Sequence, residues 1–331
     1  MPPSSDAFLA AFAERADANL AMRFDAFVDL ALYHPKLGYY AQSRPRVGYG
    51  PGTDFFTAST SGPVFGELVT AAVVQLLGSL DVAEHAFVEI GAETPGGVLT
   101  DVAHPFRAVR TIPLGGTLEI SGPCVVFSNE LFDAQPFRRF RFREGQWHEL
   151  GVGLHAGGLQ EIDLGPADPD ACGTPLLTAL VNGYTIDAPV AAAQLAGIIA
   201  RQPWTGLFVA FDYGKSWREL TEATPAGTAR AYVRHTQSND LLAQPGQQDL
   251  TCHVCWDWLS STLEHNGFSK PQLESQEAFF IRHAEKYLAA AIAADAAHFT
   301  RRKQSLLQLL HGTHLGQKFQ VLHALRSARG A

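Results

Sequence analysis

Two apolar segments in the first half of the chain end in polar residues, and this feature limits the fold more than any other. Phe87–Gly91 reads Phe-Val-Glu-Ile-Gly, and Val125–Glu130 reads Val-Val-Phe-Ser-Asn-Glu. Such runs are typical of strands buried on both faces of a parallel sheet, whose ligands bind at the carboxyl ends of the strands. We therefore predict an open α/β sheet with an enzyme pocket where these two strands end.

Hydrophobic periodicity predicts further elements around these strands. The helix over residues 63–80 has the clearest ends, because Ser61 can cap it, Pro63 suits its first turn and Gly78 lies near its end. The polar segment 215–250 is predicted to be a long functional loop. The other predicted elements are helices over 7–32, 174–200, 256–266 and 287–310, strands over 106–112, 208–214 and 319–325, and a hairpin over 138–151.

The composition is that of a globular protein and argues against nucleic-acid binding. The 331 residues are 46% hydrophobic, 18% are charged, and the net charge is −8, whereas phosphate binding needs a basic surface. Only local basic patches remain, such as 138–141 and 301–303. No apolar run approaches the roughly 20 residues of a membrane span, and the first residues lack a signal or transit pattern. Because the four cysteines are too few and scattered for a disulfide framework, we expect a cytoplasmic protein.

The polar residues after the second strand form the sharpest chemical motif, Asn129-Glu130-x-x-Asp133-x-x-Pro136. Two carboxylates and a carboxamide can hold a guanidinium or ammonium group by charge-assisted hydrogen bonds, or accept a proton from it. Glu130 is the strongest catalytic candidate, and Asp133 and Asn129 accompany it. The alternative is that Asn129 and Asp133 cap a helix or brace a loop.

Two loops are candidates for ligand contact. Gly91, Gly96 and Gly97 follow the first strand, where glycines let the backbone approach a ligand. Their spacing matches neither the dinucleotide fingerprint nor the phosphate loop, so a tight structural turn is the alternative. Residues 52–57, Gly-Thr-Asp-Phe-Phe-Thr, are either a packed surface loop or a wall of the pocket.

Other chemistries find little support in the sequence. Cys252-His253-Val254-Cys255 looks like half of a metal site, but no second pair accompanies it, so buried thiols are the simpler interpretation. Neither the His-Glu-x-x-His motif nor the Gly-x-Ser-x-Gly motif occurs. We predict no metal site.

Several of these segments together resemble the MidA-type S-adenosylmethionine-dependent methyltransferases. Mitochondrial members of that family are complex I assembly factors that methylate a protein arginine. The matching segments follow the family's order: Tyr33–Tyr40, Asp54–Ala58, Phe65–Leu68, Val88–Gly91, Asn129–Pro136, Asp212–Gly214, Gly227–Tyr232, His235, Pro245–Gly246, Asp249–Thr251 and His253–Val254.

The resemblance implies a seven-stranded Rossmann-like methyltransferase sheet with added helical cover, and S-adenosylmethionine as the cofactor. It implies that Glu130, Asp133 and Asn129 orient the methyl acceptor, so that positioning supplies much of the rate. The cofactor-binding residues it implies are Glu89, Gly91, Gly96, Gly97, Asp54, Phe55 and Thr57. The substrate-binding residues it implies are Asp212, Tyr213, His235 and His253.

The cofactor half departs from the family pattern in two places. Glu93-Thr94-Pro95 stands where the family's first loop has its central glycine. In the family a second strand ends in an acid that bonds the ribose hydroxyls, whereas segment 106–116 ends here in Ile-Pro-Leu-Gly-Gly. Glu119 is a late substitute for that acid.

The leading hypothesis is a cytoplasmic methyltransferase that acts on a protein side chain, with arginine as the expected acceptor. We expect a protein partner or a homodimer, and neither nucleic acid nor membrane. The alternatives are a catalytically degenerate binding or assembly module and a small-molecule methyltransferase. We divide the chain into a helical cover with an active-site loop over 1–80 and an α/β domain over 81–331. The apolar helices at 174–200 and 287–310 are either partner surfaces or core.

Overall fold

The chain forms two units, each assembled from three segments. The structure, a computed structural model, describes residues 5–42, 46, 53–54, 62–92, 94, 96–156, 158–168, 170–172, 176, 181–296, 298, 300–311 and 316–327. Unit 1 comprises Met1–Phe55, Phe132–Gln194 and Lys215–Asp257, and unit 2 comprises Phe56–Leu131, Leu195–Gly214 and Trp258–Ala331. This grouping describes packing; the sequence-based division at residue 80 follows predicted roles and stays a prediction.

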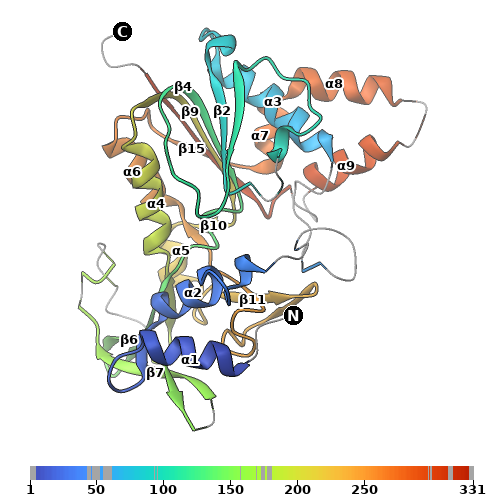
Figure 1. Cartoon of the computed structure of the whole chain (residues 1–331). Helices are drawn as coiled ribbons and strands as arrows, with labels where there is room; N and C mark the ends of the chain where they lie inside the picture. Colours follow the sequence, from blue (N-terminus) through green and yellow to red (C-terminus); the bar gives the residue numbers. More distant parts are fainter. Residues whose placement is uncertain are drawn as a thin grey trace. The chain divides into compact units, whose positions relative to one another are not determined.

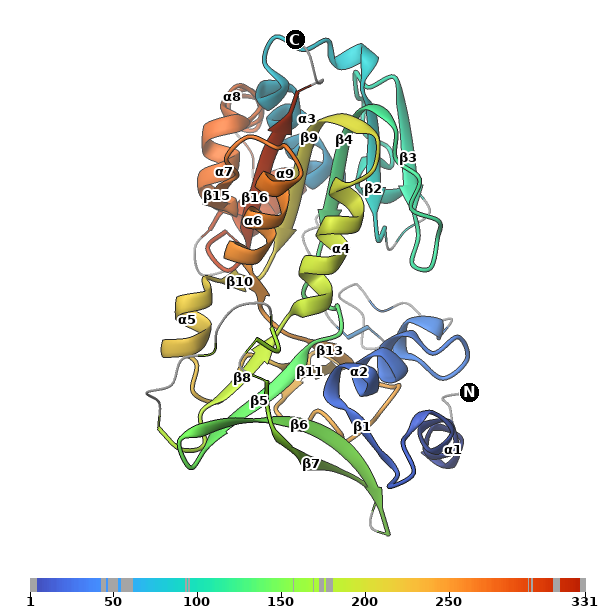
Figure 2. The same ribbon diagram turned by 90° about the vertical axis from the view of Figure 1, so that its left-hand side faces the viewer.

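Unit 2 contains a six-stranded mixed sheet (Figure 1), in which Figure 2 shows the strand order β15-β16-β9-β4-β2-β3. The strands β3, β2, β4 and β9 are parallel, with β3 at one edge of the sheet, and β16 and β15 join antiparallel at the other edge. The strands are β2 (Ala86–Ile90), β3 (Ala108–Ile112), β4 (Gly122–Asn129), β9 (Trp204–Asp212), β15 (Gln272–Ser275) and β16 (Gln320–Arg326). The predicted α/β class is therefore confirmed.

The described sheet has six strands where the resemblance implies seven. Between Gly97 and Asn129 the chain forms η4 (Gly97–Leu99), then β3, and then returns directly into β4. This interval is too short for a further strand and its crossover, because a parallel connection needs a dozen or more residues of its own. The sheet consequently ends at β3.

Helices cover both faces of this sheet (Figures 1 and 2). One face packs against α3 (Pro63–Leu77), α7 (Gln276–His283), α8 (Glu285–Ala294) and α9 (Arg301–Leu310). The other face is covered by α6 (Trp256–His265) and the later part of α4 (Val190–Ala200). Phe211 of β9 lies at the centre of the first layer, with its ring centroid 5.4–5.7 Å from those of Phe65, Phe127, Phe279 and Phe280.

Unit 1 combines two smaller antiparallel sheets with short helices. One sheet has the order β1-β6-β5-β8, with β7 also paired to β6, and the other has the order β12-β11-β13. The elements are α1 (Ser5–Arg15), β1 (Ala21–Arg23), α2 (Phe24–Tyr33), η1 (Tyr39–Ala41), β5 (Arg138–Arg143), β6 (Gln146–His155), β7 (Gly158–Pro166), β8 (Thr185–Ala188), α5 (Trp217–Glu222), β11 (Arg230–Val233), β12 (Thr236–Ser238), β13 (Asp249–Thr251) and β14 (Val254–Cys255). Two short elements complete the chain, η3 (Val82–Glu84) and β10 (Gly214–Lys215). Among the residues described, none of the helices combines the length and hydropathy needed to cross a membrane.

Two predicted N-terminal features differ in the structure. The predicted helix over 7–32 is two helices, because Asp17 accepts hydrogen bonds from the backbone N–H groups of Asn19 and Ala21, both at 2.9 Å. This turn ends α1, and β1 then pairs with β6. The helix that begins at Pro63 has Gly62 as its N-cap, and the proposed cap Ser61 lies outside the described residues. Its predicted stop at Gly78 is confirmed by a φ of +60° there.

The later predicted helices and loop also differ in part. Within 174–200 the described helix is α4 alone, and β8 precedes it because it pairs with β5. The segment 287–310 is divided between α8 and α9. The segment 215–250, predicted as an irregular loop, contains α5, β11 and β12 and enters β13.

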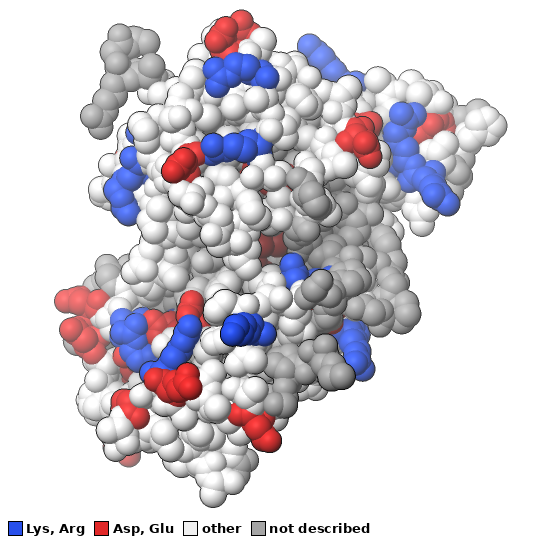
Figure 3. Space-filling model, viewed as in Figure 1, with Lys and Arg blue, Asp and Glu red and all other residues white. Residues whose placement is uncertain are grey.

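The basic residues of β5 are paired with acids. Arg138 bonds Glu149 at 2.7 Å, and Arg139 bonds the buried Asp187 at 2.6 Å. The same surface includes Arg141–Glu161, Arg143–Asp163 and His148–Asp163 pairs, and Figure 3 shows basic and acidic side chains intermixed around β6 and β7. This neutralised surface does not form the one-sided basic patch that nucleic-acid binding needs.

Candidate functional site

Glu89 braces the loop that follows β2. Its side chain is buried, and Oε2 accepts a hydrogen bond of 2.6 Å from the backbone N–H of Val98. Burial raises the pKa of Glu89 to about 7, although the Val98 hydrogen bond acts in the opposite direction. Gly97 has a φ of +65°, and a Cβ there would clash with the Glu89 carboxylate. The acid therefore requires glycine at this position.

Gly91 and Gly96 lie in equally tight surroundings. Gly91 has a φ of +77°, its N–H donates to Ile112 O at 2.9 Å, and a Cβ would lie 2.9 Å from Cδ1 of Leu131. A Cβ on Gly96 would clash with the Thr100 hydroxyl, which itself donates to the Gly97 carbonyl at 2.8 Å. Close packing therefore explains why glycine is needed at all three positions. The three glycines follow β2 at the carboxyl edge of the sheet.

The end of β4 places further polar groups at the same edge. Ile90 is paired with Ser128, and Asn129 with Phe211, so β2, β4 and β9 end side by side. Asn129 Nδ2 donates to Oε1 of Glu130 at 3.3 Å. Within the described part of the chain, Asn129 Oδ1 and Ser128 Oγ are buried without a hydrogen-bond partner. Such groups are rare in folded proteins, and a polar ligand would satisfy them.

Glu130 has a strained backbone directly after β4. Its φ is +52°, a left-handed conformation that costs a non-glycine residue energy and is concentrated at functional sites. Its N–H donates to the carbonyl of Phe211 on β9 at 2.9 Å, which fixes the turn. The side chain is thus presented just beyond the strand ends.

The end of β9 adds two of the predicted substrate residues. Asp212 is fully buried, and its carboxylate accepts from the backbone N–H of Tyr213 at 2.8 Å. The Tyr213 ring packs on Phe319 with centroids 4.0 Å apart. Unit 2 therefore brings together at one sheet edge the predicted residues Glu89, Gly91, Gly96, Gly97, Asn129, Glu130, Asp212 and Tyr213.

Unit 1 holds a second group of predicted residues around Asp54. This acid is fully buried, and its carboxylate accepts from the hydroxyl of Tyr39 at 2.7 Å and from the N–H of Arg234 at 2.8 Å. Its carbonyl accepts from the N–H of His235 at 2.7 Å. His235 lies in the turn between β11 and β12, with Nε2 3.1 Å from the Thr53 hydroxyl. Asp54 and His235 are therefore held together by hydrogen bonds between the segment 53–54 and the β11–β12 turn.

Asp133 also belongs to unit 1. It is buried, and its carbonyl accepts from the N–H of Cys252 at 2.9 Å. The adjacent His253 lies beside Lys215 and Arg230; burial, then these two cations, lower its pKa to about 4. Cys252 is among the four free, buried cysteines. Phe55 and Thr57, the remaining predicted cofactor residues, lie outside the described residues.

An acid and three tyrosines accompany this group without having been assigned a role from the sequence. Tyr40 donates to Asp249 at 3.1 Å and stacks on Tyr33, with ring centroids 5.5 Å apart. Burial raises the pKa of Asp249 to about 6. Burial also raises the pKa values of Tyr33 and Tyr40, and the negative charge of Asp249 nearby raises them further. Tyr39 is the third tyrosine, and the guanidinium of Arg46 lies 5.1 Å from the Tyr40 ring centroid. Tyr33–Tyr40 and Asp249–Thr251 are both among the segments that resemble the MidA-type family. That resemblance was the signal in the sequence that could have identified these four residues.

Glu119 does not lie at the carboxyl edge of the sheet. The neighbouring N–H of Ile120 donates to Gln202 at 2.9 Å, and Gln202 donates to Leu118 O at 2.7 Å. Gln202 precedes β9, so this segment lies at the amino edge, opposite the loop after β2. Glu119 as a substitute ribose ligand is therefore wrong.

Two crystal structures of COG1565 superfamily proteins from Burkholderia thailandensis share the fold. The first, described as a "likely methyl transferase" bound to S-adenosyl-homocysteine, has a TM-score of 0.85 at 24% identity over 99% of this chain and 94% of its own. The second, described as uncharacterized, has a TM-score of 0.82 at 23% identity over 99% and 93%. No curated protein matches the sequence.

The profile of a sequence family described as "Putative S-adenosyl-L-methionine-dependent methyltransferase" matches residues 101–273. The match includes β4, the Asn129–Pro136 motif and β9. It spans more than half of the chain. The chain therefore belongs to this S-adenosylmethionine-dependent methyltransferase family, as its resemblance to the MidA-type enzymes predicts.

Proposed function

We propose that the chain transfers a methyl group from S-adenosylmethionine to a protein side chain, with arginine as the acceptor. The observation that carries this proposal is the edge of unit 2 where β2, β4 and β9 end, in a chain that belongs to a family of S-adenosylmethionine-dependent methyltransferases. Ligands of parallel α/β sheets bind at this edge. Comparable support comes from the Burkholderia thailandensis relative, which binds S-adenosyl-homocysteine.

The residues at this edge fit the cofactor. Gly91, Gly96 and Gly97 follow β2 at this edge, and the Glu89 carboxylate holds the backbone N–H of Val98. Asn129 Oδ1 offers a buried acceptor that has no partner in the described part of the chain. These groups would hold the cofactor, which supplies an electrophilic methyl group when bound. Asp54, with Phe55 and Thr57, is proposed to complete its binding.

The proposed acceptor chemistry depends on carboxylates. A guanidinium is cationic and must present a neutral nitrogen lone pair for methylation, so an acid has to orient it and take up a proton. We assign this role to Glu130, assisted by Asn129, which donates to its Oε1. Asp133 supplies a second carboxylate, and Asp212, Tyr213, His235 and His253 are proposed substrate contacts. Positioning of the nitrogen is expected to supply most of the acceleration.

The role of Glu130 is tested by substitution with a matched control. Glu130→Gln should abolish methyl transfer to an arginine-containing protein acceptor while S-adenosylhomocysteine affinity, measured by calorimetry, stays within a factor of about two. Glu144→Gln is the control, because Glu144 also has a positive φ, +50°, but lies in the β5–β6 turn. Full transfer by the Glu130→Gln enzyme would remove Glu130 from the mechanism.

The short cofactor-binding half of the chain favours a second candidate function. β3 ends in Ile112 and is followed by Pro113 and Leu114, so no acid follows it to bind ribose hydroxyls. A degenerate member would act as a binding or assembly module. Calorimetric titration with S-adenosylhomocysteine separates the two: micromolar binding supports the enzyme, and no binding by folded protein at millimolar ligand supports the module.

The setting of the activity is part of the same proposal. We propose a cytoplasmic location, a protein substrate or partner, and self-association into a homodimer. Light scattering of the purified chain tests the homodimer, since a monomeric mass at micromolar concentration contradicts it.

A further inference from the structure

Three side chains that commonly bind metals converge on one point in unit 2, at the edge of the sheet formed by β15 and β16. They are Glu274 of β15, His283 at the end of α7 and His323 of β16. Glu274 Oε1 is 2.9 Å from Nε2 of His283 and 3.1 Å from Nε2 of His323. One ligand atom from each residue lies within 4.8 Å of the other two.

The fold fixes this convergence. Glu274 is paired with Val321 across the β15–β16 ladder, so His323, two residues further on, lies on the same face. Ser275 caps α7 directly after β15, accepting from the N–H of Ala278 at 3.2 Å, and this sets the position of the helix that carries His283. The Phe279 ring packs on both imidazoles, with centroid distances of 5.2 and 5.5 Å.

The surroundings of the three side chains match those of a metal site. Arg282 bonds the other carboxylate oxygen, Oε2, of Glu274 and leaves Oε1 directed at the two histidines. Carboxylate ligands usually have such an outer partner. The side chains of Glu274, His283 and His323 are 7%, 15% and 8% exposed.

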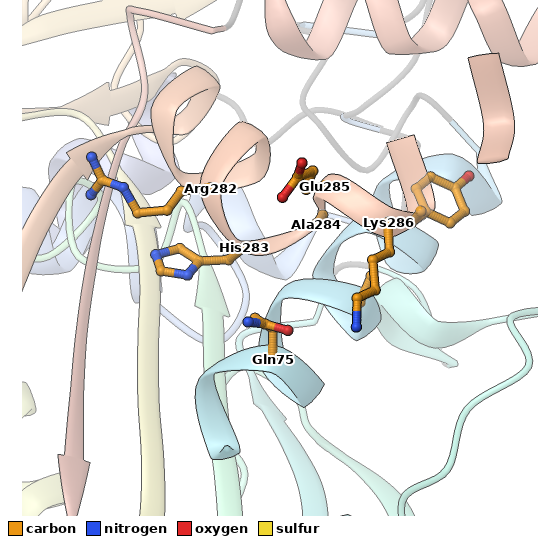
Figure 4. Close-up of a pocket in the computed structure, with 8 residues that line it drawn as sticks. Gln75, Arg282, His283, Ala284, Glu285 and Lys286 are labelled. Carbon is orange, nitrogen blue, oxygen red and sulfur yellow. The ribbon is translucent and has the colours of Figure 1, made fainter. Parts of the chain in front are cut away.

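A cavity adjoins the cluster on one side. Its lining includes Gln75, Arg282, His283, Glu285 and Lys286. In Figure 4 the side chains of Arg282 and His283 extend to one side, whereas Gln75 and Lys286 lie across from them. His283 thus belongs both to the cluster and to the cavity wall.

We propose that Glu274, His283 and His323 bind one divalent transition-metal ion, with zinc as the best match. Two imidazoles and one carboxylate are a known zinc ligand set that leaves a fourth position for water. The present N···O distances of 2.9 and 3.1 Å are those of hydrogen bonds, so binding requires each imidazole to carry its proton on Nδ1 and offer the Nε2 lone pair. The ion would tie β15, α7 and β16 together and stabilise the C-terminal strand.

Glutamine substitutions distinguish a metal site from a hydrogen-bond cluster. The amide of His283→Gln or His323→Gln can still donate to Glu274 but is a poor zinc ligand. Untagged, chelator-treated wild type should bind one equivalent of zinc chloride in calorimetry and unfold at a higher temperature with zinc. Each glutamine variant should lose at least about tenfold in affinity, and Arg282→Gln about tenfold through the outer partner.

His265→Gln is the matched control, because His265 is an exposed histidine on α6 of the same unit. It should bind zinc as the wild type does. A second measurement needs no variant: cobalt(II) added to the wild type should give the visible absorption of a four-coordinate site. Equal zinc binding by wild type and the double glutamine variant, or no stoichiometric binding by folded wild type, would overturn the proposal and leave a hydrogen-bond cluster.

Discussion

Gly97 and Glu89 depend on each other, and exchange of the glycine tests how the loop after β2 is held. Gly97→Ala forces a Cβ against the Glu89 carboxylate at a φ of +65°. Gly122→Ala is the control, because Gly122 has a φ of +72° with nothing within 4 Å of a built Cβ. Backbone strain of about 1–2 kcal/mol is common to both. Gly97→Ala should lose more stability in urea unfolding and weaken S-adenosylhomocysteine binding by at least about tenfold; equal effects would mean that the clash is relieved at no cost.

The raised pKa of Glu89 predicts how stability changes with pH. With a folded pKa of about 7 against the ordinary 4.5, the folded state holds a proton that the unfolded state has lost between these values. The free energy of unfolding should therefore fall as pH rises from about 4.5 to 7, by roughly 3 kcal/mol from this group, and level off above.

Glu89→Gln should remove this part of the pH dependence, since the glutamine oxygen can still accept from Val98. Asp249, whose pKa is also raised to about 6, remains in both proteins and cancels in the comparison. Urea unfolding at pH 4.5 and 7.5 measures the difference between the two proteins. Parallel pH profiles would show that Glu89 is ionised in the folded state at a lower pH.

Among secondary-structure elements, those with strong apolar runs could be predicted from sequence, and short polar ones could not. β2, β4 and β9 are buried on both faces, and each apolar run in the sequence ends where polar residues follow, so the end of each strand could be predicted. β15 is half exposed and four residues long, and α7 is a helix of only eight residues. Their positions follow from pairing with β16 and from packing on α3, which a local pattern does not contain.

The aromatic layer between the sheet and its helices carries an element-level prediction. Phe211 is fully buried among four other phenylalanines, so Phe211→Ala leaves a cavity and should cost about 3–5 kcal/mol in urea unfolding. Ile281→Ala on α7, where the residue is 54% exposed, should change stability by at most about 0.5 kcal/mol. A loss below 1 kcal/mol at Phe211 would mean that the layer repacks.

At the level of the whole chain, sequence reasoning located one group of site residues better than the other. Parallel strands share a carboxyl edge, so the strand pattern alone predicts that Glu89, Glu130 and Asp212 lie together. The contact of Tyr40 with Asp249 joins residues 209 positions apart, and only the fold of unit 1 reveals it. The division of the chain into two units of three segments each could not be predicted from the sequence either, because packing and not composition defines it.

This interleaving predicts that the two units unfold together. If unit 1 unfolded alone, Phe132–Gln194 and Lys215–Asp257 would become loops of 63 and 43 residues, counted from their end numbers, closed by a folded unit 2. Closing each loop costs about 3–4 kcal/mol of chain entropy, a large fraction of ordinary stability. We therefore expect one calorimetric transition, with equal calorimetric and van't Hoff enthalpies, that moves as a whole when S-adenosylhomocysteine binds. Two resolved transitions, of which the ligand shifts only one, would show that the two units unfold independently although the chain passes between them several times.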